Sequence, residues 1–207
     1  MALIRSTGIA TTAAAQPLDL QSLATQLQQG TPAERRDAAR AMATLADAGA
    51  LLTSQLEEES DRSVIEALIT SLAERADECA VTALLDCLRS EDAALRNDAI
   101  EALKTAGGRH PHLIQEALAD SDSDMRILTI GILESLRHPD VELWLIELIE
   151  HDPHLNVCAC AVDLLCEVGT ERAVPALELC RSRFPGEAYL DFAIGLALTR
   201  LQGADGL

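Results

Sequence analysis

Apolar residues recur at helical spacing along almost the whole chain, and the same pattern returns about every thirty residues. In the clearest copy, residues 92–107, the apolar stripe consists of Leu95, Ala99, Ala102, Leu103 and Ala106. The first residue of this copy aligns with Thr31, Asp61, Asp122 and Asp152. Repetition at a fixed period of this length is typical of a solenoid, in which stacked units bury each other's apolar faces.

The pattern predicts helices in pairs, each with a first (outer) and a second (inner) member. Outer helices are predicted at 18–29, 48–58, 77–89, 110–120, 139–151 and 170–183. Inner helices are predicted at 32–45, 61–74, 92–105, 122–136, 153–168 and 186–202. Thr31 and Asp152 each precede a proline, which predicts that both residues cap an inner helix. Asp61, Asp92 and Asp122 are predicted to cap in the same way.

These helices predict an all-α fold, a right-handed α-solenoid of about six helix pairs. Hydrophobic residues make up 48 % of the chain but aromatic residues only 2 %, which favours close-packed helices over a β-sandwich or barrel. No long linker interrupts the pattern, so residues 18–202 are expected to form one array. Residues 1–17 are interpreted as a disordered tail in preference to a signal peptide, because polar residues interrupt the apolar ones; residues 203–207 are expected to be flexible.

Two sequence signatures resemble a known repeat family. Asp92, Leu95, Arg96, Ala99, Ala102 and Leu103 have the spacing of the inner-helix signature of short bacterial HEAT-like repeats. The run from Ala173 to Leu177 resembles the outer-helix signature of the same repeats, which also occur in phycobilin lyases. The resemblance implies a fold whose inner helices line a concave surface, and proteins that mostly serve as binding scaffolds.

The recurring arginine of these repeats is present as Arg35, Arg96 and Arg126, and is replaced by Ile65 and Asn156. A ladder of arginines that grips an acidic partner is one interpretation. We favour a structural interpretation, in which each arginine bridges to an acid or a turn carbonyl of the adjacent repeat.

The net charge of −18 disfavours binding to nucleic acids and to anionic membranes. The six cysteines form no Cys-x-x-Cys pair and lie where Ala or Leu would also fit, as expected for reduced residues in a cytoplasmic protein. No catalytic motif is visible, so a non-enzymatic protein without a cofactor is favoured. His154 and Cys158 lie one helical turn apart and are a weak candidate for a metal site.

The positions just after the recurring arginine change in character along the chain. They are polar in the first half, as in Asn97 and Asp98, and apolar in the second, as in Ile127 and Leu128. Tight curvature that buries the apolar residues is one explanation; a groove for a partner helix, or a homodimer interface, is the other. On the second explanation, the predicted partner-binding residues are Ile127, Leu128, Gly131, Val157, Cys158, Ala161, Asp98 and Glu101.

The sequence therefore predicts a scaffold or adaptor that binds another protein on its concave face. Acidic residues favour a partner with a basic or amphipathic-helical surface. The resemblance implies an alternative: a subunit of a phycobilin lyase-like enzyme that binds an open-chain tetrapyrrole or its carrier protein.

Overall fold

The computed structural model describes residues 19–203, and every regular element among them is a helix. The outer helices are α1 (Leu20–Gln29), α3 (Gly49–Glu58), α5 (Glu78–Cys87), α7 (Pro111–Ala117), α9 (Val141–His151) and α11 (Val174–Arg183). The inner helices are α2 (Pro32–Met42), α4 (Arg62–Arg75), α6 (Ala93–Ala106), α8 (Ser123–Leu133), α10 (Leu155–Val168) and α12 (Ala188–Gly203). Short 3₁₀ helices, η1 (Ala46–Ala48), η2 (Gly107–Arg109) and η3 (Glu171–Ala173), precede α3, α7 and α11.

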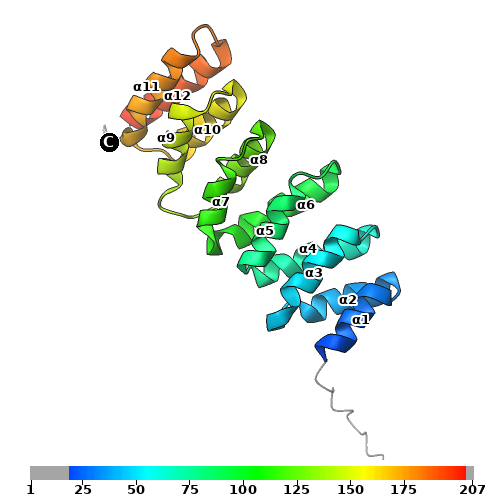
Figure 1. The fold of residues 1–207 in the computed structure, drawn as a ribbon. Helices are drawn as coiled ribbons and strands as arrows, with labels where there is room; N and C mark the ends of the chain where they lie inside the picture. The colour runs from blue at the N-terminus through cyan, green and yellow to red at the C-terminus, as the bar shows by residue number, and fades with distance from the viewer. Residues whose placement is uncertain (1–18, 204–207) are drawn as a thin grey trace, which may run out of the picture.

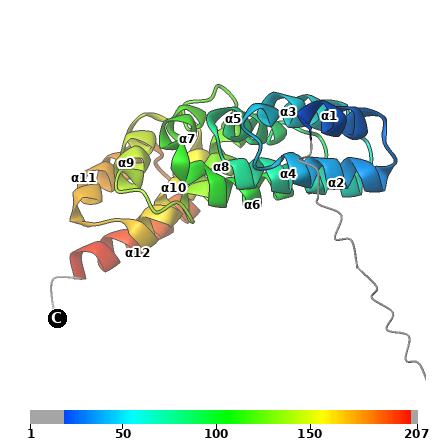
Figure 2. The ribbon, with the colours of Figure 1, turned by 90° about the horizontal axis from the view of Figure 1, so that it is seen from below.

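The helices stack into an elongated array of six pairs (Figure 1), so the predicted all-α solenoid is confirmed. Figure 2 shows that the odd-numbered helices form one layer and the even-numbered helices the other. The array bends toward the even-numbered layer at its C-terminal end. The predicted tail at 1–17 lies outside the described residues, as do residues 204–207; Gly203, predicted to be flexible, ends α12.

Capping side chains start most of the inner helices where the sequence predicted. Thr31 and Glu34 form a complete capping box at α2. The carboxylates of Asp61, Asp92 and Asp122 accept hydrogen bonds from the first backbone N–H groups of α4, α6 and α8. These bonds satisfy donors that an uncapped helix would leave without a partner.

The prediction that Asp152 caps α10 was wrong. Helix α10 begins at Leu155, and the residue at its N-cap position is His154. The carboxylate of Asp152 binds the guanidinium of Arg126 through Nε at 2.6 Å and Nη2 at 3.0 Å, and it also accepts a 2.8 Å hydrogen bond from the N–H of His154, just before the helix. Both side chains are buried, and the carboxylate and the guanidinium stabilise each other through charge-assisted hydrogen bonds.

The core is continuous along the array and consists mainly of leucine and alanine. Small residues such as Ala99 and Ala161, both fully buried, let neighbouring helices approach closely. Helix α10 packs against α8 and α9 and most extensively against α12. Because three helices surround it, its apolar residues are buried nearly all round, from Val157 to Leu165.

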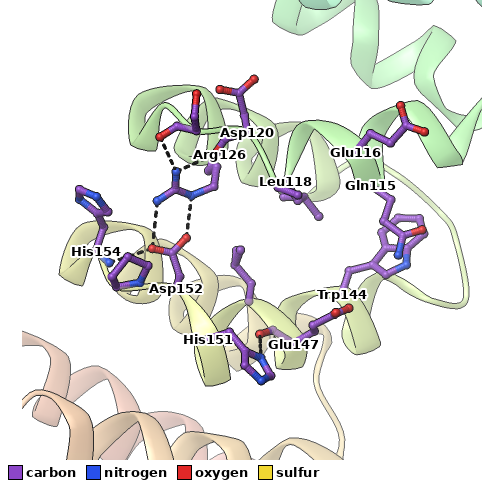
Figure 3. Close-up of a pocket in the computed structure, with 14 residues that line it drawn as sticks. Gln115, Glu116, Leu118, Asp120, Arg126, Trp144, Glu147, His151, Asp152 and His154 are labelled. Carbon is purple, nitrogen blue, oxygen red and sulfur yellow. Dashed lines mark hydrogen bonds and ion pairs between the residues drawn. The ribbon is translucent and has the colours of Figure 1, made fainter.

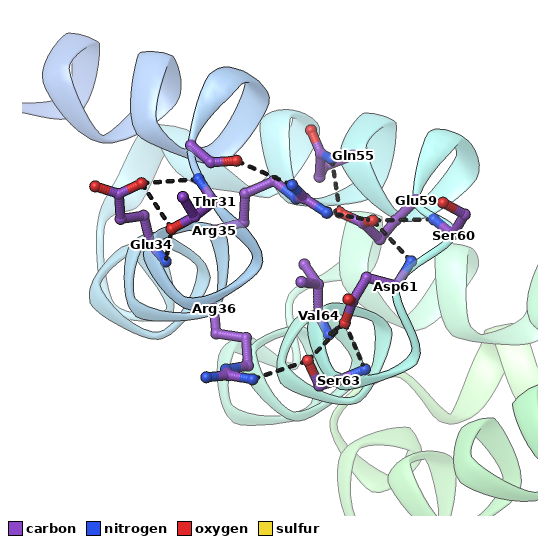
Figure 4. A network of polar contacts seen from close by, with 11 residues as sticks. Thr31, Glu34, Arg35, Arg36, Gln55, Glu59, Ser60, Asp61, Ser63 and Val64 are labelled. Atoms are coloured by element: carbon purple, nitrogen blue, oxygen red, sulfur yellow. Dashed lines mark hydrogen bonds and ion pairs between the residues drawn. The ribbon is translucent and has the colours of Figure 1, made fainter.

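Two of the recurring arginines join consecutive helix pairs, as the structural interpretation predicted. Arg35 binds Glu59 through Nε and Nη2, at 2.8 and 2.9 Å, and donates from Nη1 to the carbonyl of Gly30 (Figure 4). Arg126 repeats this geometry with Asp152 and the carbonyl of Asp120. Arg96 keeps only the bond to a turn carbonyl, that of Ser90, at 2.6 Å. Arg35 and Arg126 therefore stabilise the array and have little capacity left for an acidic partner.

Candidate functional site

Three of the predicted partner-binding residues lie in the core. Val157, Cys158 and Ala161 have no exposed surface, because α12 packs along α10 and α9 covers its other side. Their side chains cannot contact a partner, and the prediction was wrong for these three residues. For them the alternative explanation, burial between repeats and against the last helix, holds.

The other predicted residues lie at or near the surface of the inner layer. Ile127 and Leu128 are half-buried beside the turn before α6, and Gly131 is exposed on α8. Asp98 and Glu101 line a shallow groove between α4 and α6, where Arg62 pairs with Asp98 and Lys104 pairs with Glu101. The polar half of the inner layer is therefore a surface of paired charges.

Apolar exposure in the inner layer is concentrated on α12. Tyr189, Phe192 and Leu196 are 62 %, 70 % and 54 % exposed. Spacings of three and four residues place them on one face of the helix. We call these three residues the α12 stripe. The sequence prediction did not include the stripe. The buried face of α12 includes Leu190, Ala193, Ile194 and Ala197, and the available signal was that this helix carries further large apolar residues outside that face.

Alignment of α12 with α10 shows how the exposure of the stripe differs from that of the corresponding residues one repeat earlier. The buried residues Cys158, Ala161, Val162 and Leu165 of α10 correspond to Leu190, Ala193, Ile194 and Ala197 of α12, each 32 positions later. In the same register, Tyr189, Phe192 and Leu196 correspond to Val157, Cys160 and Leu164. In α10, Val157 and Leu164 are buried and Cys160 is half-buried. The stripe is therefore exposed at positions that are buried or half-buried in α10, and α12 is the last helix of the described array (Figure 2).

An acidic groove adjoins the stripe. It lies between α8 and α10, has a volume of about 270 Å³, and is lined by Gly131, Glu134, Cys160, Asp163 and Glu167 among others. The hydroxyl of Tyr189 donates a 2.7 Å hydrogen bond to the Asp163 carboxylate, which joins the stripe to the groove and raises the pKa of Tyr189. An apolar ridge beside carboxylates suits an amphipathic helix that carries basic residues.

A larger cleft of about 600 Å³ opens in the outer layer, where the packing between α7 and α9 is weakest (Figure 3). Its apolar walls include Leu118, Leu148 and Trp144, and its rim carries Glu116 and Glu147. The ring of His138 stacks on Trp144 with centroids 4.9 Å apart, which fixes the indole as part of the wall. At one end the guanidinium of Arg126 uses all three nitrogens on Asp152 and turn carbonyls. That guanidinium therefore has little capacity left to bind an anionic ligand.

The weak metal candidate, His154 with Cys158, is not assembled. Cys158 is fully buried, and its thiol donates to the carbonyl of Asp152 at 3.4 Å, whereas His154 is exposed. The hydrogen bond with Cys180, together with burial, raises the pKa of the Cys158 thiol. A thiol held in the protonated form in the core is not a metal ligand.

Comparison with known proteins supports the resemblance found in the sequence. Residues 110–185 match the family model described as HEAT repeats. No curated protein matches the chain. The described fold is thus an all-α solenoid of HEAT-like repeats, a class that commonly mediates protein–protein interaction. Among the described helices, none has both the length and the apolar character needed to cross a lipid bilayer.

Proposed function

We propose that this protein is a non-enzymatic scaffold that binds a basic, amphipathic helix of a partner protein along the inner side of its C-terminal end. The partner helix lies along the inner surface of α12 and α10. Its apolar side contacts the α12 stripe, and its basic side chains reach the groove at Glu134, Asp163 and Glu167. The exposure of the stripe, in register with positions that are covered on α10, is the observation that carries this proposal.

The two ends of the array support this choice of surface. Terminal repeats of solenoids normally present a polar outer face, which keeps the array soluble. The N-terminal end follows this rule: the exposed residues of α1 are Gln21, Ser22, Thr25, Gln28 and Gln29. The C-terminal end instead exposes two aromatic side chains and a leucine, and a contiguous apolar patch rimmed by polar groups is typical of an interaction site.

Charge supports a basic partner. Of the ionisable residues, 34 are acidic and 16 are lysine or arginine, and many of the arginines bind internal partners. Arg75, Arg183 and Arg200, for example, donate to backbone carbonyls of preceding helices and turns. The electrostatic field of the whole protein is therefore negative, which accelerates association with a basic segment and repels nucleic acid.

The proposal is tested with Leu196→Asp, using Leu179→Asp as the matched control. Both leucines are about half exposed, but Leu179 lies on the outer helix α11. The probe is a labelled Leu/Lys peptide with an apolar helical face, followed by fluorescence anisotropy. Burying a leucine contributes about 1.5–3 kcal/mol, so Leu196→Asp should weaken binding at least about tenfold. Leu179→Asp should bind like the wild type.

Two further peptides separate recognition from charge attraction. A Leu/Glu peptide with the same pattern should not bind. A Leu/Lys peptide of the same composition but without an apolar face should bind much more weakly. Equal binding by the two leucine variants, or by the two Leu/Lys peptides, would disprove docking on the stripe. Circular dichroism checks that both variants keep the helical content of the wild type.

The phycobilin lyase-like alternative depends on the cleft between α7 and α9, whose volume of about 600 Å³ suits a folded open-chain tetrapyrrole. Two features disfavour this alternative, because a tetrapyrrole carries anionic propionates. The acidic rim of the cleft repels them, and the guanidinium of Arg126 is already bound to Asp152. Titration with a bilin, followed by absorbance, decides: an unchanged spectrum at saturating protein excludes this alternative.

A further inference from the structure

Three potential metal ligands meet where two neighbouring outer helices begin. Glu78 is the first residue of α5, and His112 is the second residue of α7. His110 immediately precedes α7, with Pro111 between the two histidines. Because α5 and α7 belong to consecutive pairs of the solenoid, their N-terminal ends lie at the same edge of the outer layer.

The three side chains converge. The imidazole rings of His110 and His112 have centroids 5.9 Å apart, and Nε2 of His112 lies 3.9 Å from Oε1 of Glu78. One ligand atom from each of the three residues lies within 4.8 Å of the other two. Ligand atoms around a tetrahedral Zn²⁺ are about 3.3 Å apart, given Zn–N and Zn–O distances of about 2.0–2.1 Å. Small rotations of Glu78 and His112, whose side chains are 69 % and 54 % exposed, close that gap.

We propose that Glu78, His110 and His112 form a Zn²⁺ site that links α5 to α7. Two imidazoles and one carboxylate are the ligand types that Zn²⁺ prefers, whereas Mg²⁺ and Ca²⁺ require oxygen ligands. Three protein ligands leave the fourth tetrahedral position to water. Proline at the first position of α7 fixes the backbone between the two histidines, so the pair is partly preorganised.

The charges around the site act on a bound cation in both directions. The N-terminal ends of α5 and α7 carry partial positive charge, which opposes metal binding. The carboxylate of Glu78 offsets it, whereas the carboxylate of Asp77, which also lies near His110, is paired with the guanidinium of Arg75. Asp77 is held in place by Arg75 and by the N–H of Ala80, so it would orient the surroundings of the metal without ligating it.

The position of the site gives it a structural consequence. Helix α7 has only seven residues and packs weakly on α5 and on α9. It also forms one wall of the cleft (Figure 3). A metal that joins its start to α5 would therefore hold that wall in place. This inference does not depend on the function proposed above.

The test uses the full chain without an affinity tag, since a polyhistidine tag would itself bind metal. Zn²⁺ is titrated in competition with a chromophoric chelator, and Co²⁺ is added separately because its absorption spectrum reports tetrahedral coordination. The wild type should bind one Zn²⁺. His112→Ala and Glu78→Gln should each weaken binding at least about tenfold. The control, His154→Ala, changes an exposed histidine outside the cluster and should bind like the wild type.

A second readout separates a built site from adventitious binding. Saturating Zn²⁺ should raise the Tm of the wild type and of His154→Ala by at least about 2 °C, and leave that of His112→Ala unchanged. Hydrogen exchange in α7 should slow in the same two proteins. Affinity no tighter than millimolar, or equal affinity in wild type and His112→Ala, would overturn the proposal.

Discussion

At the scale of single residues, buried polar contacts are concentrated where one helix pair meets the next. Arg35 and Arg126 each hold a carboxylate that follows the outer helix of the next pair. The sequence predicted this use of arginine from its recurrence. It did not indicate Asp152, since an aspartate before a proline is equally typical of a helix cap, and only the fold brings it next to Arg126.

Glu59 gives a pH-dependent prediction. Burial raises its pKa, but hydrogen bonds from Arg35, Gln55 and the N–H groups of Asp61 and Ser60 outweigh burial and lower the pKa to about 2 (Figure 4). Because the pKa of Glu59 is lower in the folded than in the unfolded protein, its ionised carboxylate stabilises the fold at pH values above 4.5, the unfolded pKa. This stability is lost as the pH falls toward 2.

We therefore expect Glu59→Gln to lower the free energy of unfolding at neutral pH by about 3 kcal/mol. The difference from the wild type should shrink between pH 5 and pH 2. Urea denaturation across this range measures it. Glu58→Gln, a change at the exposed neighbouring residue, serves as the control and should have little effect at any pH. A wild type-like pH profile in Glu59→Gln would contradict the assignment of the low pKa.

At the scale of helices, local sequence predicted the elements well and their surroundings less well. All twelve α-helices in the described part of the chain lie close to the predicted ranges, because capping residues and apolar periodicity act within a few residues. Which apolar residues are exposed depends on neighbours distant in sequence. Val157 is buried because α12 covers α10, whereas Tyr189, at the corresponding position of α12, is exposed. The repeat pattern assigns similar roles to both positions.

The two kinds of aspartate give a prediction at this scale. Asp92 caps α6 from the surface, whereas Asp152 is the buried partner of Arg126. Asp92→Ala should cost about 1 kcal/mol of stability, as the loss of a cap does. Asp152→Ala should cost about 3–5 kcal/mol, because it leaves the guanidinium buried without its counter-charge. Equal losses for the two variants in urea denaturation would show that the pairing of Asp152 with Arg126 contributes no more stability than a surface cap.

At the scale of the whole molecule, an apolar end and a large negative charge oppose each other. The α12 stripe would favour pairing of two copies through their C-terminal ends, since the same face would be covered in both. A net charge of −18 on each copy opposes that encounter. Repulsion is strong at low ionic strength, because the Debye length is then about 10 Å or more. In 1 M salt the Debye length shortens to about 3 Å, so the repulsion is screened.

The balance predicts the oligomeric state. We expect a monomer at low ionic strength and weak self-association in 1 M salt, measured by sedimentation velocity over a range of concentrations. Phe192→Asp should abolish the self-association, whereas Leu179→Asp on the outer layer should leave it unchanged. A stable dimer at low salt that Phe192→Asp dissolves would mean that a second copy of the chain, and not a basic partner helix, occupies the stripe. Repulsion between copies is weakest in 1 M salt. A monomer under that condition would indicate that the three exposed side chains of the stripe contribute too little for self-association. Binding of a partner would then also need the carboxylates of the adjoining groove.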